Sequence, residues 1–218
     1  MSVPASDRPT AVRGRRPARP SGDDRELAIL ATAERLLAEK PLATISVDDL
    51  ARGAGISRPT FYFYFPSKDA VLLTMLDRVV AEADEALHQA FGAGPTDPRE
   101  GWRRAITSYY ETFRRHRALT LAWAEARFTN AEVRALWAQV FDGWVRQSAA
   151  AIDAERAKGV AAAGVPARDL AVVLNSMNER ALYASFSGDG PAVAEADVVD
   201  VLLEVWLTAI YGRTSGLD

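Results

Sequence analysis

The sequence predicts an all-α protein of about nine helices, because apolar residues recur every three to four positions along most of its length. Beyond a glycine- and proline-rich linker at residues 92–98, no segment alternates with the period of two that a half-buried strand needs. In the C-terminal part, helices are expected over about 99–116, 118–127, 130–158, 166–187 and 192–212. The expected parts are a flexible basic arm (1–22), a three-helix unit (23–68), a connecting helix (69–91) and a C-terminal helical bundle (92–218).

The composition is that of an ordinary globular protein, with 49% hydrophobic and 25% charged residues among 218. There is no cysteine, which excludes disulfides and thiolate zinc sites. Charges interrupt every apolar run before about 18 residues, and the Arg- and Pro-rich N-terminus lacks the apolar segment of a signal peptide. We therefore expect a soluble cytoplasmic protein that spans no membrane and needs neither a metal nor a cofactor.

Basic charge is concentrated at the N-terminus, although the whole chain has a net charge of −3. Residues 1–70 hold 11 Lys and Arg against 9 Asp and Glu, whereas the remainder holds 15 against 20. Within the arm, the Arg-Gly-Arg-Arg-Pro run at 13–17 is similar to an AT-hook core, in which arginines enter a narrow minor groove. The alternative is a solvated tail whose arginines touch phosphates without reading sequence.

Two short helices joined by a glycine turn are predicted between residues 46 and 68. Ser46 and Asp49 have the spacing of a capping box for the first of them, and Ser57 is the expected N-cap of the second. Between them lies Gly-Ala-Gly at 53–55, which ends the first helix. Two short helices joined in this way are typical of a helix-turn-helix.

An aromatic run covers the second of these short helices. A helix has one buried face, so five consecutive aromatic residues cannot all belong to the core. We expect Phe61 and Phe65 to point inward and Tyr62, Phe63 and Tyr64 to point toward DNA. The alternative for the two tyrosines is that they only cover the core.

Three spaced groups of residues resemble the DNA-binding signature of the TetR family of transcriptional repressors. They are Ser46-x-x-Asp49-Leu50-Ala51, Ala54-Gly55-Ile56-Ser57 and Tyr62-x-Tyr64-Phe65-x-x-Lys68. The resemblance covers about residues 24–75, and the nine-helix layout extends it to the whole chain. It implies a homodimeric repressor that binds double-stranded operator DNA and responds to a small-molecule effector.

In the docking that this resemblance implies, the third helix enters the major groove. Arg58 is the candidate for a base contact, because its guanidinium fork matches O6 and N7 of guanine. Asp48 and Asp49 bring negative charge into the same region; either they cap the second helix and face away from DNA, or they lower its affinity. The predicted DNA-binding residues are Thr44, Ser46, Ser57, Arg58, Pro59, Thr60, Tyr62, Phe63, Tyr64 and Lys68, of which the resemblance assigns Tyr62, Tyr64 and Lys68 to phosphates.

Aromatic stripes at helical spacing recur in the C-terminal bundle. Such a stripe is typical of a core, but here two amides and a carboxylate accompany it, and polar groups in an apolar interior need partners. We therefore predict an elongated apolar ligand channel, which the resemblance also implies. Its predicted residues are Trp102, Ile106, Tyr109, Phe113, Trp137, Phe141, Trp144, Ser148, Asn175, Asn178, Glu179, Leu182, Tyr183 and Trp206.

Asn178 is the expected hydrogen-bond anchor for the ligand, with Asn175 next. Glu179 has two interpretations: it binds the ligand, or it pairs with Arg180 or another arginine. The expected ligand is a hydrophobic, elongated and largely uncharged small molecule, because no cationic pair converges on these faces.

The last two helices are expected to form the dimer interface, as the resemblance implies. Apolar residues on the last helix cover more than one face, which suggests burial against both the bundle and a partner; the alternative is a fully buried helix in a monomer. These residues are Val198, Val199, Leu202, Leu203, Val205, Trp206 and Ile210. Filling the channel is expected to spread the two DNA-binding heads through the fourth helix and so release DNA.

Catalysis is not expected. The chain has two histidines and no cysteine, and it contains neither a phosphate-binding glycine loop nor a nucleophile motif. The alternative function is a helical adaptor that binds another protein rather than DNA. Salt-dependent binding to the region upstream of its own gene would separate a DNA-binding regulator from an adaptor.

Overall fold

A computed structural model of the protein describes residues 22–92 and 97–212, with side chains placed outside 90–92. The predicted basic arm lies almost entirely outside these residues. The described part contains α-helices and one short 3₁₀ helix and no strand, so the predicted all-α fold is confirmed. The elements are α1 (Gly22–Glu39), η1 (Leu42–Thr44), α2 (Val47–Gly53), α3 (Arg58–Tyr64), α4 (Lys68–Gly92), α5 (Pro98–Arg115), α6 (Arg117–Thr129), α7 (Ala131–Ala157), α8 (Ala167–Ser187) and α9 (Val198–Tyr211).

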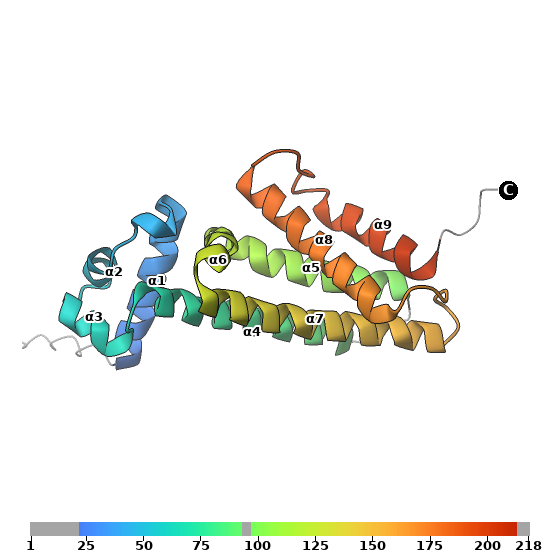
Figure 1. Cartoon of the computed structure of the whole chain (residues 1–218), viewed down its shortest axis with the longest axis horizontal. Coiled ribbons are helices and arrows are strands. Elements are labelled where there is room, and N and C mark those ends of the chain that lie inside the picture. The colour runs from blue at the N-terminus through green and yellow to red at the C-terminus, as the bar shows by residue number, and fades with distance from the viewer. Residues whose placement is uncertain (1–21, 93–96, 213–218) are drawn as a thin grey trace, which may run out of the picture.

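The helices form a small three-helix head and a larger body, joined by α4. Figure 1 shows α1–α3 together at one end of the molecule, with α4 running from them along the body beside α7. Helices α5, α8 and α9 form the opposite layer of the body. Helix α6 lies at the junction and contacts both α1 and α4. The head is therefore attached to the body at two places, through α4 and through α6.

The turn between α2 and α3 needs its two glycines for different reasons. Gly55 has a φ of +68°, a left-handed conformation that side chains with a Cβ rarely adopt. Gly53 is the last residue of α2, and a Cβ there would lie 2.3 Å from Cγ2 of Thr32 on α1. Gly55 thus reverses the chain, whereas Gly53 permits the close approach of α2 to α1.

The predicted boundaries agree with the structure to within two residues in the body, except at the start of α9. This helix begins at Val198, six residues later than expected. The preceding segment is held out of helical geometry by side chains of other helices. The Ser185 hydroxyl donates to the carbonyl of Val193 at 2.8 Å, and the Tyr110 hydroxyl donates to the carbonyl of Glu195 at 3.3 Å.

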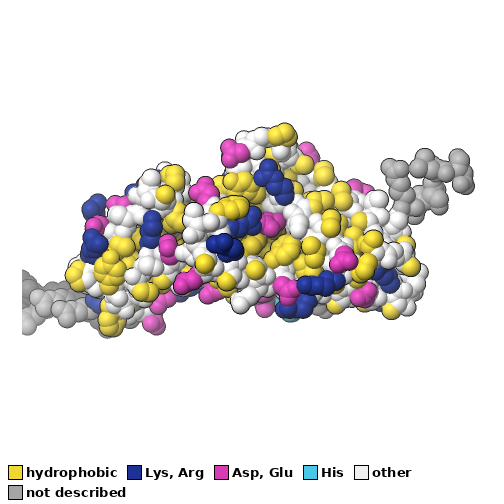
Figure 2. All heavy atoms as spheres, viewed as in Figure 1, with side chains coloured by type: hydrophobic (Ala, Val, Ile, Leu, Met, Phe, Trp, Pro, Cys, Tyr) yellow, Lys and Arg dark blue, Asp and Glu magenta, His cyan; other side chains and the backbone are white. Residues whose placement is uncertain are grey.

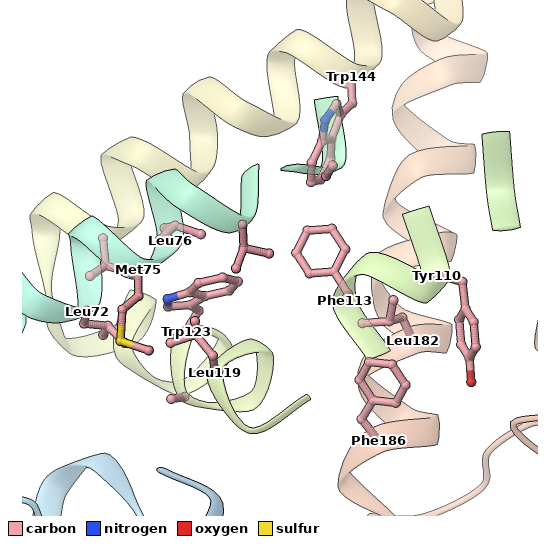
Figure 3. Close-up of a cluster of buried hydrophobic side chains, with 14 of the residues drawn as sticks. Leu72, Met75, Leu76, Tyr110, Phe113, Leu119, Trp123, Trp144, Leu182 and Phe186 are labelled. Atoms are coloured by element: carbon pink, nitrogen blue, oxygen red, sulfur yellow. The ribbon is translucent and has the colours of Figure 1, made fainter. Parts of the chain in front are cut away.

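One hydrophobic core runs through both parts of the molecule. In the head it includes Ile29 and Phe61, and in the body Leu76, Phe113 and Phe186, all nearly inaccessible to solvent. Figure 3 shows Phe113 between Trp144 and Leu182, with Trp123 next to Met75. Burying each such large side chain contributes roughly 1.5–3 kcal/mol to folding. The head and the body therefore share a continuous apolar core.

Polar contacts also hold the head against the body. The ring nitrogens of His116, at the corner between α5 and α6, lie 2.9 Å from Oε1 of Glu34 and 3.1 Å from Oε2 of Glu82. Glu34 belongs to α1 and Glu82 to α4. A second ion pair joins Arg78 of α4 to Glu26 of α1 at 3.1 Å. These contacts fix the orientation of α1 relative to α4.

Candidate DNA interface and ligand cavity

Helix α3 divides its aromatic residues between the core and the surface. Phe61 and Phe65 are 0% and 5% exposed, which confirms that they point inward. Phe63 is 84% exposed and Tyr62 46% exposed, whereas Tyr64 is half-buried against the core. In Figure 2, hydrophobic side chains lie beside Lys and Arg side chains on this end of the molecule. An exposed surface of mixed aromatic and basic character suits nucleic acid better than solvent.

The N-terminus of α3 is closed by Ser57, as predicted. Its Oγ accepts from the backbone N–H of Thr60 at 3.3 Å and lies 2.8 Å from Oγ1 of the same residue. Pro59 is exposed in the first turn, where its missing N–H leaves no helical hydrogen bond unmade. The cap leaves Arg58 and Pro59 at the exposed tip of the helix, where the predicted base contact would be made.

Arg58 is engaged within the free protein. Its Nη1 lies 3.1 Å from Oδ2 of Asp48, and its Nη2 donates to the hydroxyl of Tyr62 at 3.4 Å. The Tyr62 hydroxyl, followed by the charge of Asp48, raises the pKa of Arg58 above its ordinary value. Asp48 is thus the ion-pair partner of the predicted base-reading residue and points toward the first turn of α3. Both side chains are half exposed, so this pair stabilises the fold little and can open.

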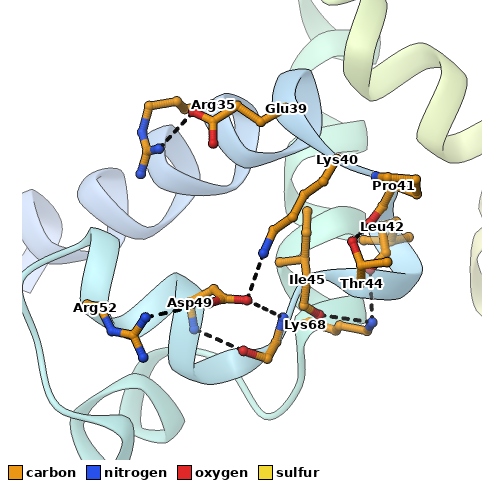
Figure 4. Close-up of polar contacts among 11 residues, drawn as sticks. Arg35, Glu39, Lys40, Pro41, Leu42, Thr44, Ile45, Asp49, Arg52 and Lys68 are labelled. Carbon is orange, nitrogen blue, oxygen red and sulfur yellow. Dashed lines mark hydrogen bonds and ion pairs between the residues drawn. The ribbon is translucent and has the colours of Figure 1, made fainter.

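Asp49, by contrast, has the predicted structural role. It forms a capping box with Ser46: each backbone N–H is bound by the side chain of the other residue at 3.1 Å. Oδ2 of Asp49 also accepts from Nζ of Lys40 at 3.0 Å, as Figure 4 shows. Lys40 foremost, and then Ser46, lowers the pKa of Asp49 to about 2. This carboxylate fixes the start of α2 against the end of α1.

Two of the predicted DNA-binding residues, Lys68 and Thr44, bind the protein's own backbone. Nζ of Lys68 donates to the carbonyls of Leu42 at 3.0 Å and Ile45 at 3.2 Å, as Figure 4 shows. The hydroxyl of Thr44 donates to the carbonyl of Pro41 at 2.8 Å. Lys68 therefore holds the turn before α2, and one of its three N–H groups is left for another acceptor. The sequence did not reveal this role because η1 has no motif of its own.

The body contains a cavity of about 400 Å³ between α4, α5, α6, α7 and α8, which is open to solvent on the side of the exposed Phe128. This volume is within the range typical of small-molecule sites. Six of the predicted ligand-binding residues line it: Tyr109, Phe113, Trp137, Glu179, Leu182 and Tyr183. Leu76 of α4 is part of the same wall, so the helix that bears the head touches the cavity directly.

The remaining predicted residues do not extend this cavity into one channel. Seven of them, together with Tyr109, surround a separate chamber of about 40 Å³: Trp102, Ile106, Trp144, Ser148, Asn175, Asn178 and Trp206. Phe141 lines neither space and packs against the core instead. The ring of Tyr109 divides the two chambers and packs 5.3 Å from the ring of Trp144 and 4.9 Å from that of Phe113. The predicted single channel is thus closed in this conformation.

Both predicted amide anchors already have partners within the protein. Oδ1 of Asn178 accepts from Nε1 of Trp206 at 2.9 Å, and both groups are buried. Nδ2 of Asn175 donates to Oγ of Ser148 at 3.1 Å and to a backbone carbonyl of its own helix at 2.9 Å. A ligand that bonded to Oδ1 of Asn178 would have to share or displace the Trp206 contact.

The charged lining of the main cavity differs from expectation. Arg127 and Arg180 both line it, so the prediction that no cationic pair converges there is wrong. Glu179 forms an ion pair with Arg127 rather than with Arg180, whose guanidinium lies 5.7 Å from the ring centre of Tyr183. Burial, followed by the charge of Glu179, raises the pKa of Tyr109, which Arg127 partly opposes. Sequence reasoning missed Arg127 because α6 has no aromatic stripe to mark it as a wall.

None of the described helices combines the length and apolar character needed to cross a bilayer. Nor does the described part of the chain contain a group of acidic, histidine or cysteine side chains arranged to hold a metal ion. A helix-turn-helix head on a helical body with a deep cavity is the architecture of a ligand-responsive DNA-binding regulator.

Comparison with known families defines the class as TetR-type transcriptional regulators. The family described as "Bacterial regulatory proteins, tetR family" matches residues 29–75, and "Transcriptional regulator EthR, C-terminal domain" matches residues 102–212. The chain belongs to the EthR family within that class. The match of the second model includes helices α6–α9 completely, so the family assignment covers the body as well as the head.

Similar proteins support both levels of this assignment. The chain is 58% identical to the HTH-type transcriptional regulator EthR of Mycobacterium tuberculosis, over 98% of this chain and 99% of that protein. It is 50% identical to EthR of Mycolicibacterium smegmatis over 92% of each. Among solved structures, a putative transcriptional regulator from Saccharomonospora viridis in complex with choline aligns with a TM-score of 0.75 at 24% identity, covering 88% of this chain and all of that one. At this identity the structural likeness shows the fold alone.

Proposed function

We propose that the protein is a ligand-responsive repressor. A homodimer binds operator DNA through α3 and releases it when a hydrophobic small molecule fills the cavity of the body. The observation that carries the proposal is the contribution of Leu76, on the helix that bears the head, to the wall of a 400 Å³ cavity. As a regulator of operator DNA, the protein acts in the cytoplasm.

Exposed valines on α8 and α9 support dimerisation through these two helices. Val172 and Val173 on α8 are 37% and 64% exposed, and Val201 and Val205 on α9 are 44% and 41% exposed. The opposite face of α9 is buried within the same chain, as Leu203 and Trp206 show. The alternative of a fully buried α9 in a monomer is therefore contradicted. A helix that is apolar on both faces needs a second surface to cover it.

The dimer makes DNA binding sensitive to geometry. Two α3 helices must lie about 34–36 Å apart to enter successive major grooves. A ligand weakens binding when it prefers a conformation in which this spacing is lost. Arg58 is the proposed base-reading residue, and Tyr62, Phe63 and Tyr64 contact the backbone or thymine methyl groups. The structure also leads us to reassign Lys68 chiefly to holding η1 and α2 in place.

The test combines three measurements on the purified full chain. Operator binding is measured by fluorescence anisotropy with a duplex from the region upstream of its own gene, at several salt concentrations. Each member of a series of straight-chain alcohols from hexan-1-ol to tetradecan-1-ol is screened by thermal shift and then added to the DNA complex. We expect tight, salt-dependent binding, a rise in Tm with the best alcohol, and a weaker complex in its presence.

Light scattering reports the oligomeric state, and charged substitutions at Val173 and Val205 should convert a dimer to a monomer. Equal affinity for the upstream duplex and a scrambled duplex would contradict the repressor proposal, and a lack of salt-dependent binding to either duplex would favour the adaptor. An alcohol that raises Tm without changing operator affinity would contradict the proposed release mechanism.

A further inference from the structure

Helix α7 is fastened to α4 at two points that lie far apart. Nδ2 of Asn130 donates to Oδ2 of Asp69 at 3.1 Å, and Nε1 of Trp144 donates to Oδ1 of Asp84 at 3.1 Å. Asp69 and Asp84 are 15 residues apart on α4, and Asn130 and Trp144 are 14 residues apart along α7 and its N-cap. In both helices the contact nearer the head comes first along the chain. At about 1.5 Å per helical residue, the two contacts are separated by roughly 21–23 Å. Helices α4 and α7 therefore run parallel, with one polar contact at the start of both helices and the other in the middle of α7.

The two contacts have different surroundings. The Asn130 contact lies beside the head, since Asp69 follows the first residue of α4. Oδ1 of Asn130 also caps α7 by accepting from the N–H groups of Glu132 and Val133, so the start of α7 is held firmly. The Trp144 contact lies farther from the head, at the middle of α7, among the aromatic rings beside the two chambers. Trp144 is 6% exposed and packs edge-to-face against Tyr109, Phe113 and Trp137 at ring-centre distances of 5.3, 5.7 and 5.7 Å.

We infer that the Trp144–Asp84 hydrogen bond transmits cavity occupancy to α4. This inference rests on the proposed function and names the residue pair that couples its two sites. A ligand that opens the passage between the chambers must displace Tyr109, and Trp144 packs directly against that ring. Leaving the buried indole N–H without its acceptor would cost free energy, so a shift of Trp144 draws Asp84 with it.

The direction of the resulting motion follows from the second contact. The Asn130–Asp69 contact holds α4 near the head, while the displacement is applied 15 residues farther along, through Asp84. A helix held near one end and displaced farther along tilts about the held point. A tilt of α4 changes the orientation of α3, which precedes it by only a few residues. Asp84 is therefore a positioning residue, and it acts on DNA through α4.

Asp84 can be altered without changing the walls of either chamber. It faces an outer groove with Asp77, Val80 and His88, and it lines neither the large nor the small chamber. Apolar packing by Leu76 gives the cavity another contact with α4, but this contact is untouched by a substitution at Asp84. The coupling through Leu76 and the coupling through Asp84 can thus be tested separately.

The test compares Asp84→Ala with Asp84→Asn, in which the amide oxygen can still accept from the indole. The control is Tyr211→Phe, which removes the acceptor of another indole, Nε1 of Trp102, in a contact between α5 and α9. The measured quantity is the ratio of operator Kd with and without the alcohol that most raises the wild-type Tm. If this ratio is roughly tenfold or more for the wild type, we expect it to fall below about twofold for Asp84→Ala.

Asp84→Asn and Tyr211→Phe should keep the wild-type ratio, and the alcohol should bind all variants with the same affinity in the absence of DNA. An Asp84→Ala variant that binds the alcohol and still shows the full wild-type ratio would overturn the inference. So would an equal loss in Tyr211→Phe, because the effect would then be a general consequence of losing an indole contact.

A second measurement needs no ligand. Trp144→Phe and Asp84→Ala remove the same hydrogen bond, so each should change operator Kd by the same factor, and the double variant should change it no further. Additive effects would contradict the inference. If no alcohol raises the wild-type Tm but the effects of the two substitutions are non-additive, the proposed class of ligand is wrong. The coupling between Trp144 and Asp84 is then still supported.

Discussion

The head and the body satisfy their polar groups in different ways. In the head, the partners of Ser46, Ser57 and Arg58 all lie within ten residues along the chain. In the body, Asn178 bonds to a residue 28 positions away and Arg127 to one 52 positions away. The helix caps of the head are thus local contacts that a motif can specify, although Lys68 reaches back 26 residues to Leu42, whereas the cavity is built from contacts that only the fold brings together. Substitutions in the two regions should differ accordingly.

The largest expected effect is the loss of stability when the buried face of α3 is altered rather than its exposed face. Phe61→Ala removes a fully buried ring from the core of the head and should lower the free energy of unfolding by about 3–5 kcal/mol. Phe63→Ala alters a ring that is 84% exposed and should change stability by less than about 0.5 kcal/mol while weakening operator binding. Urea denaturation and anisotropy measure the two quantities. Similar losses of stability in both variants would contradict the division of the aromatic run.

Next in size is the loss of sequence preference in Arg58→Ala. If Arg58 reads a guanine, the preference for operator over scrambled DNA should fall by about 5- to 150-fold, with a smaller change on scrambled DNA. The matched variant Asp48→Ala frees Arg58 from its ion-pair partner and should bind both duplexes more tightly, scrambled DNA most, so its preference falls less than that of Arg58→Ala. Equal losses on both duplexes for Arg58→Ala would show that it contacts only phosphates.

The division of the cavity can be tested by opening it. Tyr109→Ala removes the ring shared by the two chambers and should move the best-binding alcohol to a longer chain. Each additional buried methylene contributes about 0.8 kcal/mol, so affinity should continue to rise beyond the wild-type optimum. Isothermal titration of the alcohol series measures this. The control is Phe141→Ala, on a ring that lines neither chamber, and an equal shift there would contradict the role of Tyr109.

The smallest effect concerns pH and the cap of α2. Because the folded-state pKa of Asp49 is lowered to about 2, its contribution to stability is present above its unfolded pKa and is lost as pH falls toward 2. Asp49→Asn should therefore lower Tm at pH 7 by about 2–4 °C, and the difference from wild type should shrink in acid. Thermal melts over the acidic range measure it. A difference that stays constant down to pH 2 would show that the charge of Asp49 does not matter.

What could be predicted from the sequence follows the same contrast between local and distant contacts. The capping box at Ser46, the cap at Ser57 and the inward Phe61 depend on spacing along one helix, so the pattern sufficed. The closure of the channel by Tyr109 depends on how α5 packs against α7, and the Arg127–Glu179 pair depends on how α6 meets α8. No periodicity within one segment contains that information. The Asp48–Arg58 pair was not predicted, because it joins side chains of two helices across the turn.

The contact between Arg58 and Asp48 has a consequence for how the protein searches DNA. In the free head the guanidinium is already neutralised, so it adds little to the attraction of the head for phosphates in general. Guanine O6 and N7 offer a bidentate replacement for the carboxylate, whereas other base edges do not. Within the proposed complex, Arg58 would change partner only where the correct base is present. The acidic residue inside the motif would then reduce time spent on wrong sites and favour discrimination over strength of binding.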